Sequence, residues 1–398
     1  MRVVSIGDLV TDFYYKNGKL VGVNGGMTAH NIIANVSQFG LKTAVFGVCG
    51  DDMAGNVAIK SLKDCAVDIS NIKIIPGLSS RCFHVSYTGE KGVLSFTSKK
   101  RCPICNQKKW YGESYIDVSF VLENINKDDI LVFDNLNEKN QNIIDSCNNK
   151  KMLDLGQYFE LDNYPDDILI KKIKNKFDII NLNERVEKYL KDRFNKKNIL
   201  EIYELLCPKL IIVTRGKKGS DFVLESNEIN KKLIKPASEI DPTGAGDAFF
   251  SVFISEYIKN NYVIDNNFID LTFKKSTKLT SKVVKKFGAR GHIQNLYKIK
   301  KISDKCTCND FLISTRKPVK RCSININNFE TRVINAIKPD VYDEFKKINF
   351  ANMRNPLFIG AGGSYAGAMF SSIVINELYG INAICDYPRN IFIETINS

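Results

Sequence analysis

The segment Asp241-Pro242-Thr243-Gly244-Ala245-Gly246-Asp247-Ala248-Phe249-Phe250 constrains the fold and chemistry of this chain more than any other. Its glycines allow a tight turn, and the apolar pattern that follows predicts a long helix. Amides at the N-terminus of such a helix favour a phosphate. Unless it binds a metal or faces solvent, Asp247 would repel that phosphate, so it indicates a base that deprotonates an attacking hydroxyl. The alternative is a plain glycine turn whose aspartate stabilises the helix dipole.

The first two-thirds of the chain alternates short β-branched runs with longer amphipathic stretches. This pattern is typical of parallel strands joined by helices, and it predicts an α/β fold with a doubly wound sheet. The strands that we expect cover residues 3–6, 43–48, 130–133, 152–155, 178–180 and 210–214. Residues 81–97 have a strand-turn-strand pattern, which predicts a small lid or an edge outside the main sheet.

The ten-residue segment resembles the C-terminal signature of the ribokinase-type, or PfkB, carbohydrate kinase family. The N-terminal signature of that family is similar to a segment that contains Gly25, Gly26, Asn31, Gly40 and residues 50–55. The interval between Gly26 and Asn31 is one residue longer than the common form, so either His30 or Asn31 would face the sugar. The resemblance covers residues 1–292 and implies a ribokinase-like, doubly wound, mostly parallel sheet with a small β lid.

The resemblance implies ATP-dependent phosphorylation of a hydroxyl on a small sugar, sugar derivative or nucleoside. Asp247 would be the general base, and the amides of Gly244, Ala245 and Gly246 would form the anion hole. The expected substrate-binding residues are Asp8, Asp12, Gly25, Gly26 and Asn31. We expect Asp8 and Asp12 to end the first strand and to accept hydrogen bonds from substrate hydroxyls. For Asp12 the alternative is a loop cap.

The nucleotide-binding residues that the resemblance implies are Asn181, Glu184, Thr214, Gly216, Gly219 and Thr243. Residues 181–184 resemble the Asn-x-x-Glu element of the family, which helps to place magnesium and phosphate through water. Asn183 is alternatively the cap of the following helix. Residues 214–219 resemble the turn that approaches the nucleotide. The implied cofactors are ATP and Mg²⁺, and some members of the family also need a monovalent cation.

A second, shorter unit follows the kinase-like region. Residues 298–328 lack a sustained period and predict a linker, so we divide the chain into 1–297, 298–328 and 329–398. Residues 356–366 predict a strand, a glycine turn and a helix N-terminus, and they resemble the opening of a sugar isomerase (SIS) domain. Gly362, Gly363 and Ser364 would bind a phosphosugar there. Because the chain stops at Ser398, we expect a partial SIS-like segment, either a remnant or a piece that another chain completes.

Composition argues against several other classes of protein. The formal net charge is +13, but the lysines are dispersed, so we expect no nucleic-acid partner. No run of about 20 apolar residues occurs, which predicts a cytoplasmic protein with no membrane partner. The 11 cysteines favour reduced thiols over a disulfide framework. Cys102 and Cys105 with Cys306 and Cys308 leave zinc binding or redox chemistry open, but we favour inert thiols and no protein metal site.

Two functional classes remain after these exclusions. The first is a kinase, and the second is a catalytically weak regulatory protein that binds a sugar or nucleotide and uses the SIS-like segment for interaction. The presence of Asp247 with its glycines favours the kinase. The expected partner is a small sugar-like substrate, and the resemblance also suggests a homodimer that pairs through the lids.

Overall fold

A computed structural model of the chain describes residues 1–76, 80–88, 93–98, 115–156, 161–225, 227–232, 239–298, 357–359 and 384–386. The chain divides into two compact units, Met1–Arg316 and Lys317–Ser398. In the second unit, β14 (Leu357–Ile359) and β15 (Ile384–Asp386) are described, and they pair in parallel. Strand β14 confirms the short strand predicted there, while the domain division at 297 and 328 stays a prediction.

The central sheet of the first unit contains nine strands among the described residues, in the order β13-β12-β11-β10-β9-β8-β1-β4-β5. Their bounds are β1 Val3–Asp8, β4 Thr43–Gly50, β5 Asp68–Ile75, β8 Ile130–Phe133, β9 Lys150–Leu155, β10 Ile179–Asn183, β11 Leu210–Thr214, β12 Ser220–Leu224 and β13 Asn227–Lys231. Seven neighbouring strands, from β5 to β11 in this order, run parallel. Strand β12 pairs antiparallel with β11, and β13 pairs antiparallel with β12. The predicted doubly wound, mostly parallel sheet is therefore confirmed.

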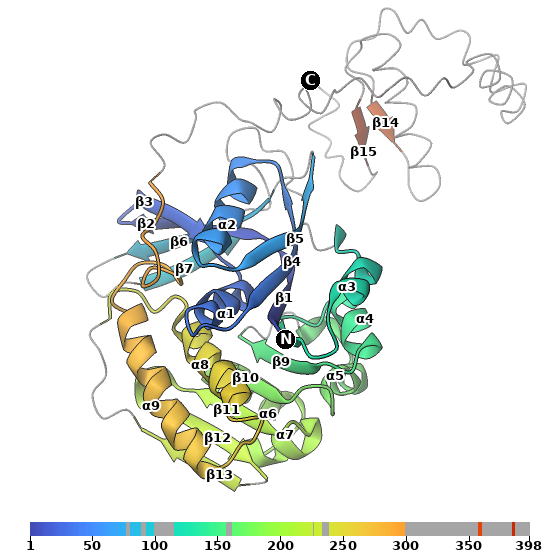
Figure 1. Cartoon of the computed structure of the whole chain (residues 1–398), viewed down its shortest axis with the longest axis vertical. Coiled ribbons are helices and arrows are strands. Elements are labelled where there is room, and N and C mark those ends of the chain that lie inside the picture. Colours follow the sequence, from blue (N-terminus) through green and yellow to red (C-terminus); the bar gives the residue numbers. More distant parts are fainter. Residues whose placement is uncertain are drawn as a thin grey trace, which may run out of the picture. The chain divides into compact units, whose positions relative to one another are not determined.

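Helices cover both faces of this sheet, as Figure 1 shows. One buried core packs β-strand side chains against α1 Thr28–Ser37, α2 Met53–Asp64, α8 Ala245–Lys259 and α9 Asn266–Val283. The other core lies under α3 Val118–Asn124, α4 Glu138–Ser146, α5 Asp166–Ile173, α6 Glu184–Arg193 and α7 Ile199–Leu206. Burial on both faces explains why the central strands are continuous apolar runs.

A separate four-stranded sheet has the order β3-β2-β6-β7. Its strands are β2 Val10–Lys16, β3 Lys19–Gly25, β6 Arg81–Thr88 and β7 Val93–Ser98. The antiparallel pair of β6 and β7 confirms the predicted strand-turn-strand unit outside the main sheet. Strands β2 and β3 complete this lid sheet.

The carboxyl ends of the parallel strands meet at one edge of the central sheet. Asp8 ends β1, Asp134 follows β8, Asp154 lies near the end of β9, and Thr214 ends β11. Sheets of this kind bind their ligands at that edge. In the part of the chain that is described, no helix has the length and apolar character needed to cross a membrane.

Candidate active site

The turn before α8 is fixed by glycine and by a buried carboxylate. Gly244 has φ 77°, and a Cβ atom there would lie 2.5 Å from Ala289 Cα, so only glycine fits. The fully buried Asp241 accepts hydrogen bonds from the Thr243 amide at 2.8 Å and from the Gly288 amide at 2.6 Å. The predicted segment therefore forms the expected glycine turn and helix, held against the loop at residue 288.

Asp247 lies in the first turn of α8 and is bound by a residue of α1. Asn31 Nδ2 donates to Asp247 Oδ2 at 2.8 Å. His30 instead contacts Ser5 Oγ at 2.8 Å and the Asp8 carbonyl oxygen at 3.2 Å, and its side chain is buried. Burial lowers the pKa of His30 to about 3, so it is neutral. Of the two alternatives, Asn31 is the one whose side chain reaches Asp247.

The environment of Asp247 makes its carboxylate unusually basic. Burial, with a smaller contribution from the negative charge of Asp134, raises the pKa of Asp247 to about 6 against the lowering effects of the Asn31 hydrogen bond and the charge of Arg290. A carboxylate with a pKa near 6 is mostly ionised at neutral pH and accepts a proton more readily than an ordinary aspartate does.

Two more carboxylates lie on the side of the lid sheet. Asp8 ends β1, as predicted, is buried, and lies 4.0 Å from Arg81 in an ion pair. Asp12 lies within lid strand β2 and not at the end of the first strand, which corrects that prediction and the loop-cap alternative. The Tyr14 hydroxyl donates to Asp12 Oδ2 at 3.1 Å. Burial raises the pKa of Asp12 to about 7, against the lowering effect of the Tyr14 hydrogen bond.

The paired glycines at the end of β3 make room for charged groups. A Cβ atom on Gly25 would lie 2.4 Å from an Arg290 guanidinium nitrogen. A Cβ atom on Gly26 would lie 2.5 Å from both carboxylate oxygens of Asp12. Contacts this short do not occur between real atoms, so a side chain at either position would displace the Arg290 guanidinium or the Asp12 carboxylate. The structure thus gives Gly25 and Gly26 a role in placing Arg290 and Asp12.

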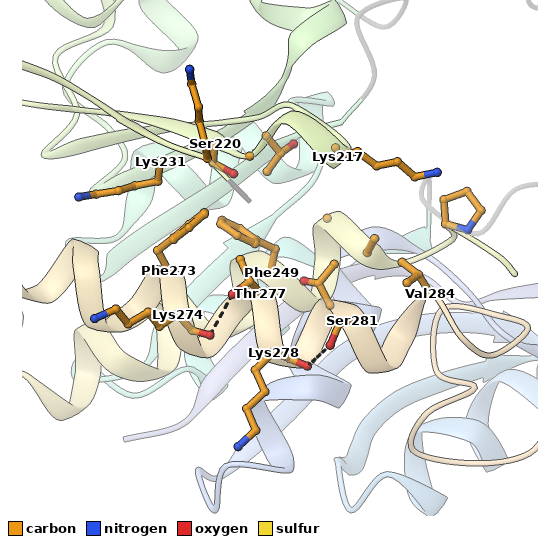
Figure 2. A pocket seen from close by; sticks show the side chains of 18 of the residues that line it. Lys217, Ser220, Lys231, Phe249, Phe273, Lys274, Thr277, Lys278, Ser281 and Val284 are labelled. Carbon is orange, nitrogen blue, oxygen red and sulfur yellow. Dashed lines mark hydrogen bonds between the residues drawn. The ribbon is translucent and has the colours of Figure 1, made fainter. Parts of the chain in front are cut away.

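A cavity of about 650 Å³ opens beside the α8 N-terminus. Three of the predicted nucleotide-binding residues line it, Thr214, Gly216 and Gly219, together with Ala245 and Gly246 of the predicted anion hole. Figure 2 shows the rings of Phe249 and Phe273 side by side, pointing toward the strand that carries Ser220. Thr243, Asn181 and Glu184 do not line this cavity.

The turn between β11 and β12 is held by backbone and charge contacts. The Arg215 amide donates to Gly219 O at 2.9 Å. Gly219 has φ 112°, and a Cβ atom there would lie 1.9 Å from Lys231 O. The Arg215 guanidinium pairs with Glu187 at 2.8 Å and with Asp221. This network fixes the wall of the cavity that the turn provides.

The two ends of the predicted Asn-x-x-Glu element have different partners. Asn181 is buried in β10 and donates to Asp154 Oδ2 at 2.7 Å. Glu184 begins α6 and pairs with Lys218 at 2.9 Å. Asn183 accepts hydrogen bonds from the amides of Arg185 and Val186, which confirms the helix-cap alternative.

Sequence reasoning missed three residues of this site: Asp134, Asp154 and Arg290. Burial raises the pKa of Asp154 to about 8, and the charge of Asp247 adds to the rise. The Asp134 carboxylate accepts a hydrogen bond from the Ala29 amide at 2.9 Å. A signal was present for both aspartates, because each is an acidic residue at the carboxyl end of a predicted buried strand. Arg290 follows Gly288 and Ala289 and carried no comparable signal.

Other predicted residues lie outside the described ones. These are Gly362, Gly363 and Ser364 of the SIS-like segment, and Cys102, Cys105, Cys306 and Cys308. Within the ranges that the structure describes, no group of three or more His, Cys, Asp or Glu side chains is arranged to hold a metal ion. Free thiols are present at Cys49, Cys65, Cys82, Cys147 and Cys207.

Comparisons with known proteins identify the family of this chain. Residues 2–294 match the model of the pfkB family carbohydrate kinase. The chain is 26% identical over 293 residues to 5-dehydro-2-deoxygluconokinase of Mesomycoplasma hyopneumoniae strain 7448, covering 66% of this chain and 82% of that protein.

Two solved structures resemble the fold. One is a fructokinase double mutant from Vibrio cholerae O395, bound to fructose, ADP and a potassium ion, with a TM-score of 0.59 and 18% identity over 74% of this chain and 95% of that one. The other is the nucleoside kinase of Methanocaldococcus jannaschii, with a TM-score of 0.56 and 20% identity over 75% of this chain and 95% of that one.

Proposed function

The chain belongs to the pfkB family of carbohydrate kinases, and we propose that Asp247 is the general base of its reaction. As a member of this family, it is an enzyme that transfers a phosphoryl group from ATP to a hydroxyl group of a small sugar or nucleoside. In the proposed step, Asp247 takes the hydroxyl proton as the substrate oxygen attacks the γ-phosphorus. The bond from that phosphorus to the bridging oxygen breaks, and ADP leaves.

One observation carries this proposal: the first turn of α8 contains both residues that line the cavity and a carboxylate that is held by a hydrogen bond. Ala245 and Gly246 line the cavity. Asp247 is the next residue, and its carboxylate is held by Asn31 from α1. A phosphoryl group at the turn and a hydroxyl group at Asp247 would thus lie within one helical turn of each other, which is the arrangement that in-line transfer needs.

The anion hole would stabilise charge on the transferred group. The predicted donors are the amides of Gly244, Ala245 and Gly246, at the positive end of the α8 dipole. The Ala245 amide donates to Pro242 O at 3.1 Å. We therefore assign the main role to Gly244 and Gly246, and Ala245 joins them only when its bond to Pro242 opens.

Asp8 and Asp12 would bind the sugar-like substrate. Both are buried, and ionised carboxylates accept several hydrogen bonds from hydroxyl groups. Each hydroxyl that donates to Asp12 favours its ionised form, so substrate binding and proton release from Asp12 are coupled. A polyhydroxylated substrate suits these acceptors. The names of the relatives suggest hexose-like sugars, deoxy-sugar acids and nucleosides as the first compounds to test.

Magnesium would be needed to neutralise the phosphate oxygens of ATP when the nucleotide is bound. The buried Asn181 Oδ1 accepts no hydrogen bond from any described residue. Its neighbour Asp154 is a buried carboxylate whose pKa is raised by burial. Mg²⁺ commonly uses one or two carboxylates and several waters, so these residues fit a water-mediated site, with Glu184 as the outer carboxylate that the sequence predicted. A monovalent cation near the anion hole is a further proposal, supported by the potassium-bound Vibrio cholerae fructokinase.

The C-terminal unit has a separate proposed role as a partial SIS-like module that binds a phosphosugar. The parallel pairing of β14 and β15 supports this proposal, because a SIS-like module would contain a parallel sheet. Gly362, Gly363 and Ser364 would contact the phosphate. Calorimetric titration of the chain with sugar phosphates, compared with Ser364→Ala, tests this proposal, and equal affinity in the two proteins would contradict it.

The experiment that identifies the reaction is a measurement of ADP production across a panel of acceptors. The panel contains fructose, ribose, a deoxy-sugar acid, cytidine and adenosine, each with ATP and Mg²⁺. We expect one class of acceptor to give turnover far above the rate without acceptor. Stimulation by none of them, with ATP bound, would favour the regulatory alternative.

A further inference from the structure

Arg290 is a fully enclosed cation beside the candidate active site. Its side chain is 1% exposed. Burial lowers the pKa of Arg290, but a guanidinium starts from so high a value that it stays protonated at neutral pH. A buried positive charge is costly to leave without partners, so its contacts indicate what it does.

The guanidinium donates to neutral acceptors in α1, in α2 and in the residue that follows β3. Arg290 Nε donates to Asn31 Oδ1 at 2.9 Å, one terminal nitrogen donates to Ser61 Oγ at 2.7 Å, and the other donates to Gly26 O at 3.0 Å. Within the described residues, no carboxylate lies within ion-pair distance of it. Its charge therefore acts on the nearby carboxylates through space and through Asn31.

The contact with Asn31 determines how that side chain is turned. A carboxamide has one acceptor oxygen and one donor nitrogen. Because Arg290 can only donate, the oxygen of Asn31 must face it, and the Asn31 amide hydrogens then face Asp247 Oδ2 at 2.8 Å. With the opposite orientation, Asn31 would present its oxygen to a carboxylate oxygen, which repels it.

We propose that Arg290 is a positioning residue for the transfer reaction: it holds Asn31 with its amide hydrogens toward Asp247, and its charge keeps the Asp247 carboxylate ionised. This inference rests on the proposed role of Asp247 as the base. Gly25 supports it, because a side chain at that position would occupy the space of the guanidinium.

The other charges around Asp247 oppose Arg290. Asp134 raises the pKa of Asp247, and Asp247 in turn raises the pKa of Asp12 and Asp154. Arg290 lowers the pKa of both Asp12 and Asp247. Arg290 is thus a buried cation that offsets the negative charge around Asp12 and Asp247.

The test is a carboxyl titration by ¹³C NMR in the 398-residue chain labelled at aspartate, with the Asp247 signal identified by its loss in Asp247→Asn. In Arg290→Met we expect the midpoint of Asp247 to move up by about one pH unit. Arg290→Lys keeps the charge, so its midpoint should stay near that of the wild type. If Arg290→Met does not fold, Arg290→Gln replaces it, with the same shift expected.

Ser61→Ala is the matched control, because it removes another hydrogen bond of Arg290 and leaves Asn31 in place. We expect the Asp247 midpoint to stay unchanged in this variant. The acidic limb of kcat/KM should move with the midpoint in Arg290→Met and should not move in Ser61→Ala. An unmoved midpoint in Arg290→Met, with loss of activity at every pH, would show a merely structural role and would overturn the inference. Absence of turnover in the wild type would count against the proposed function alone, because the titration does not depend on activity.

Discussion

Asn31 Nδ2 lies 2.8 Å from Asp247 Oδ2, so a hydrogen bond joins the first helix of the chain to the N-terminal turn of α8. The two residues are separated by 216 positions in the sequence. Each belongs to one of the two signatures that the sequence contains. Their contact joins α1, which follows the lid strand β3, to α8, whose first turn lines the nucleotide cavity.

Asn31→Ala tests this contact. The substitution removes the hydrogen bond that lowers the pKa of Asp247. We expect the acidic limb of kcat/KM to move to higher pH and kcat at neutral pH to fall roughly 10-fold to 100-fold, the range typical of misplacing a catalytic base. Steady-state kinetics over a range of pH measures both effects. The affinity for ADP should stay within about twofold, since Asn31 does not line the nucleotide cavity; an unmoved limb would argue against the contact.

Gly219→Ala tests the turn that forms the nucleotide cavity. A Cβ atom there would lie 1.9 Å from Lys231 O, a backbone atom that cannot move without opening the strand pair. We expect KM for ATP to rise at least about 10-fold, which corresponds to about 1.4 kcal/mol of lost binding. Gly216→Ala is the control. Gly216 also has a positive φ, 55°, but nothing lies near its added methyl, so its effect should be smaller. Equal effects of the two substitutions would contradict this role for the turn.

Asp154→Asn tests the buried carboxylates through the pH dependence of stability. The pKa of Asp154 is raised to about 8 by burial. Because its folded pKa lies above the unfolded value, Asp154 stabilises the fold fully below about pH 4, and this stabilisation is lost as the pH rises through about 8. Between about pH 6.5 and 8.5 we expect the free energy of unfolding of the wild type to fall by ~2 kcal/mol on this account. Denaturant titration at both pH values measures the fall.

The Asp154→Asn variant is the control for that titration. Its side chain keeps an acceptor oxygen for the Asn181 amide but does not titrate. Asp154→Asn should remove the larger part of the fall, and Asp12, with a pKa of about 7, accounts for the remainder. The buried His30 has a pKa lowered to about 3. Its effect on stability lies below about pH 6.5 and outside this window. A fall of the same size in Asp154→Asn would contradict the assignment.

The strands that the sequence predicted best are those buried on both faces. Residues 130–133 and 210–214 were predicted at the bounds that β8 and β11 have, because a continuous β-branched run has few alternatives. Three of the strands that were missed are partly exposed or interrupted. Strand β2 contains Asp12, β3 contains two glycines, and β5 has mixed exposure at an edge of the sheet. Their periodicity is too weak to separate them from loops.

The site was predictable where local chemistry requires a particular residue. Gly244 and Asp247 could be identified because a glycine turn and a helix N-terminus leave a signature in consecutive residues. Arg290 could not, since its partner Asn31 lies 259 positions away and the need for a buried cation arises only when the carboxylates are brought together. The placement of Asp12 in the lid was missed for the same reason, because it depends on how the chain pairs after β1.

The most direct test of the central claim is kcat of Asp247→Asn compared with the wild type, on whichever acceptor the panel identifies, with the dissociation constants of ADP and of the acceptor measured on both proteins. Asparagine keeps an acceptor oxygen for the Asn31 amide but cannot take a proton. The account predicts that kcat falls by roughly 10²-fold to 10⁴-fold while both dissociation constants change by less than about fivefold. Turnover within about threefold of the wild type would show that Asp247 is not the base and would contradict the account.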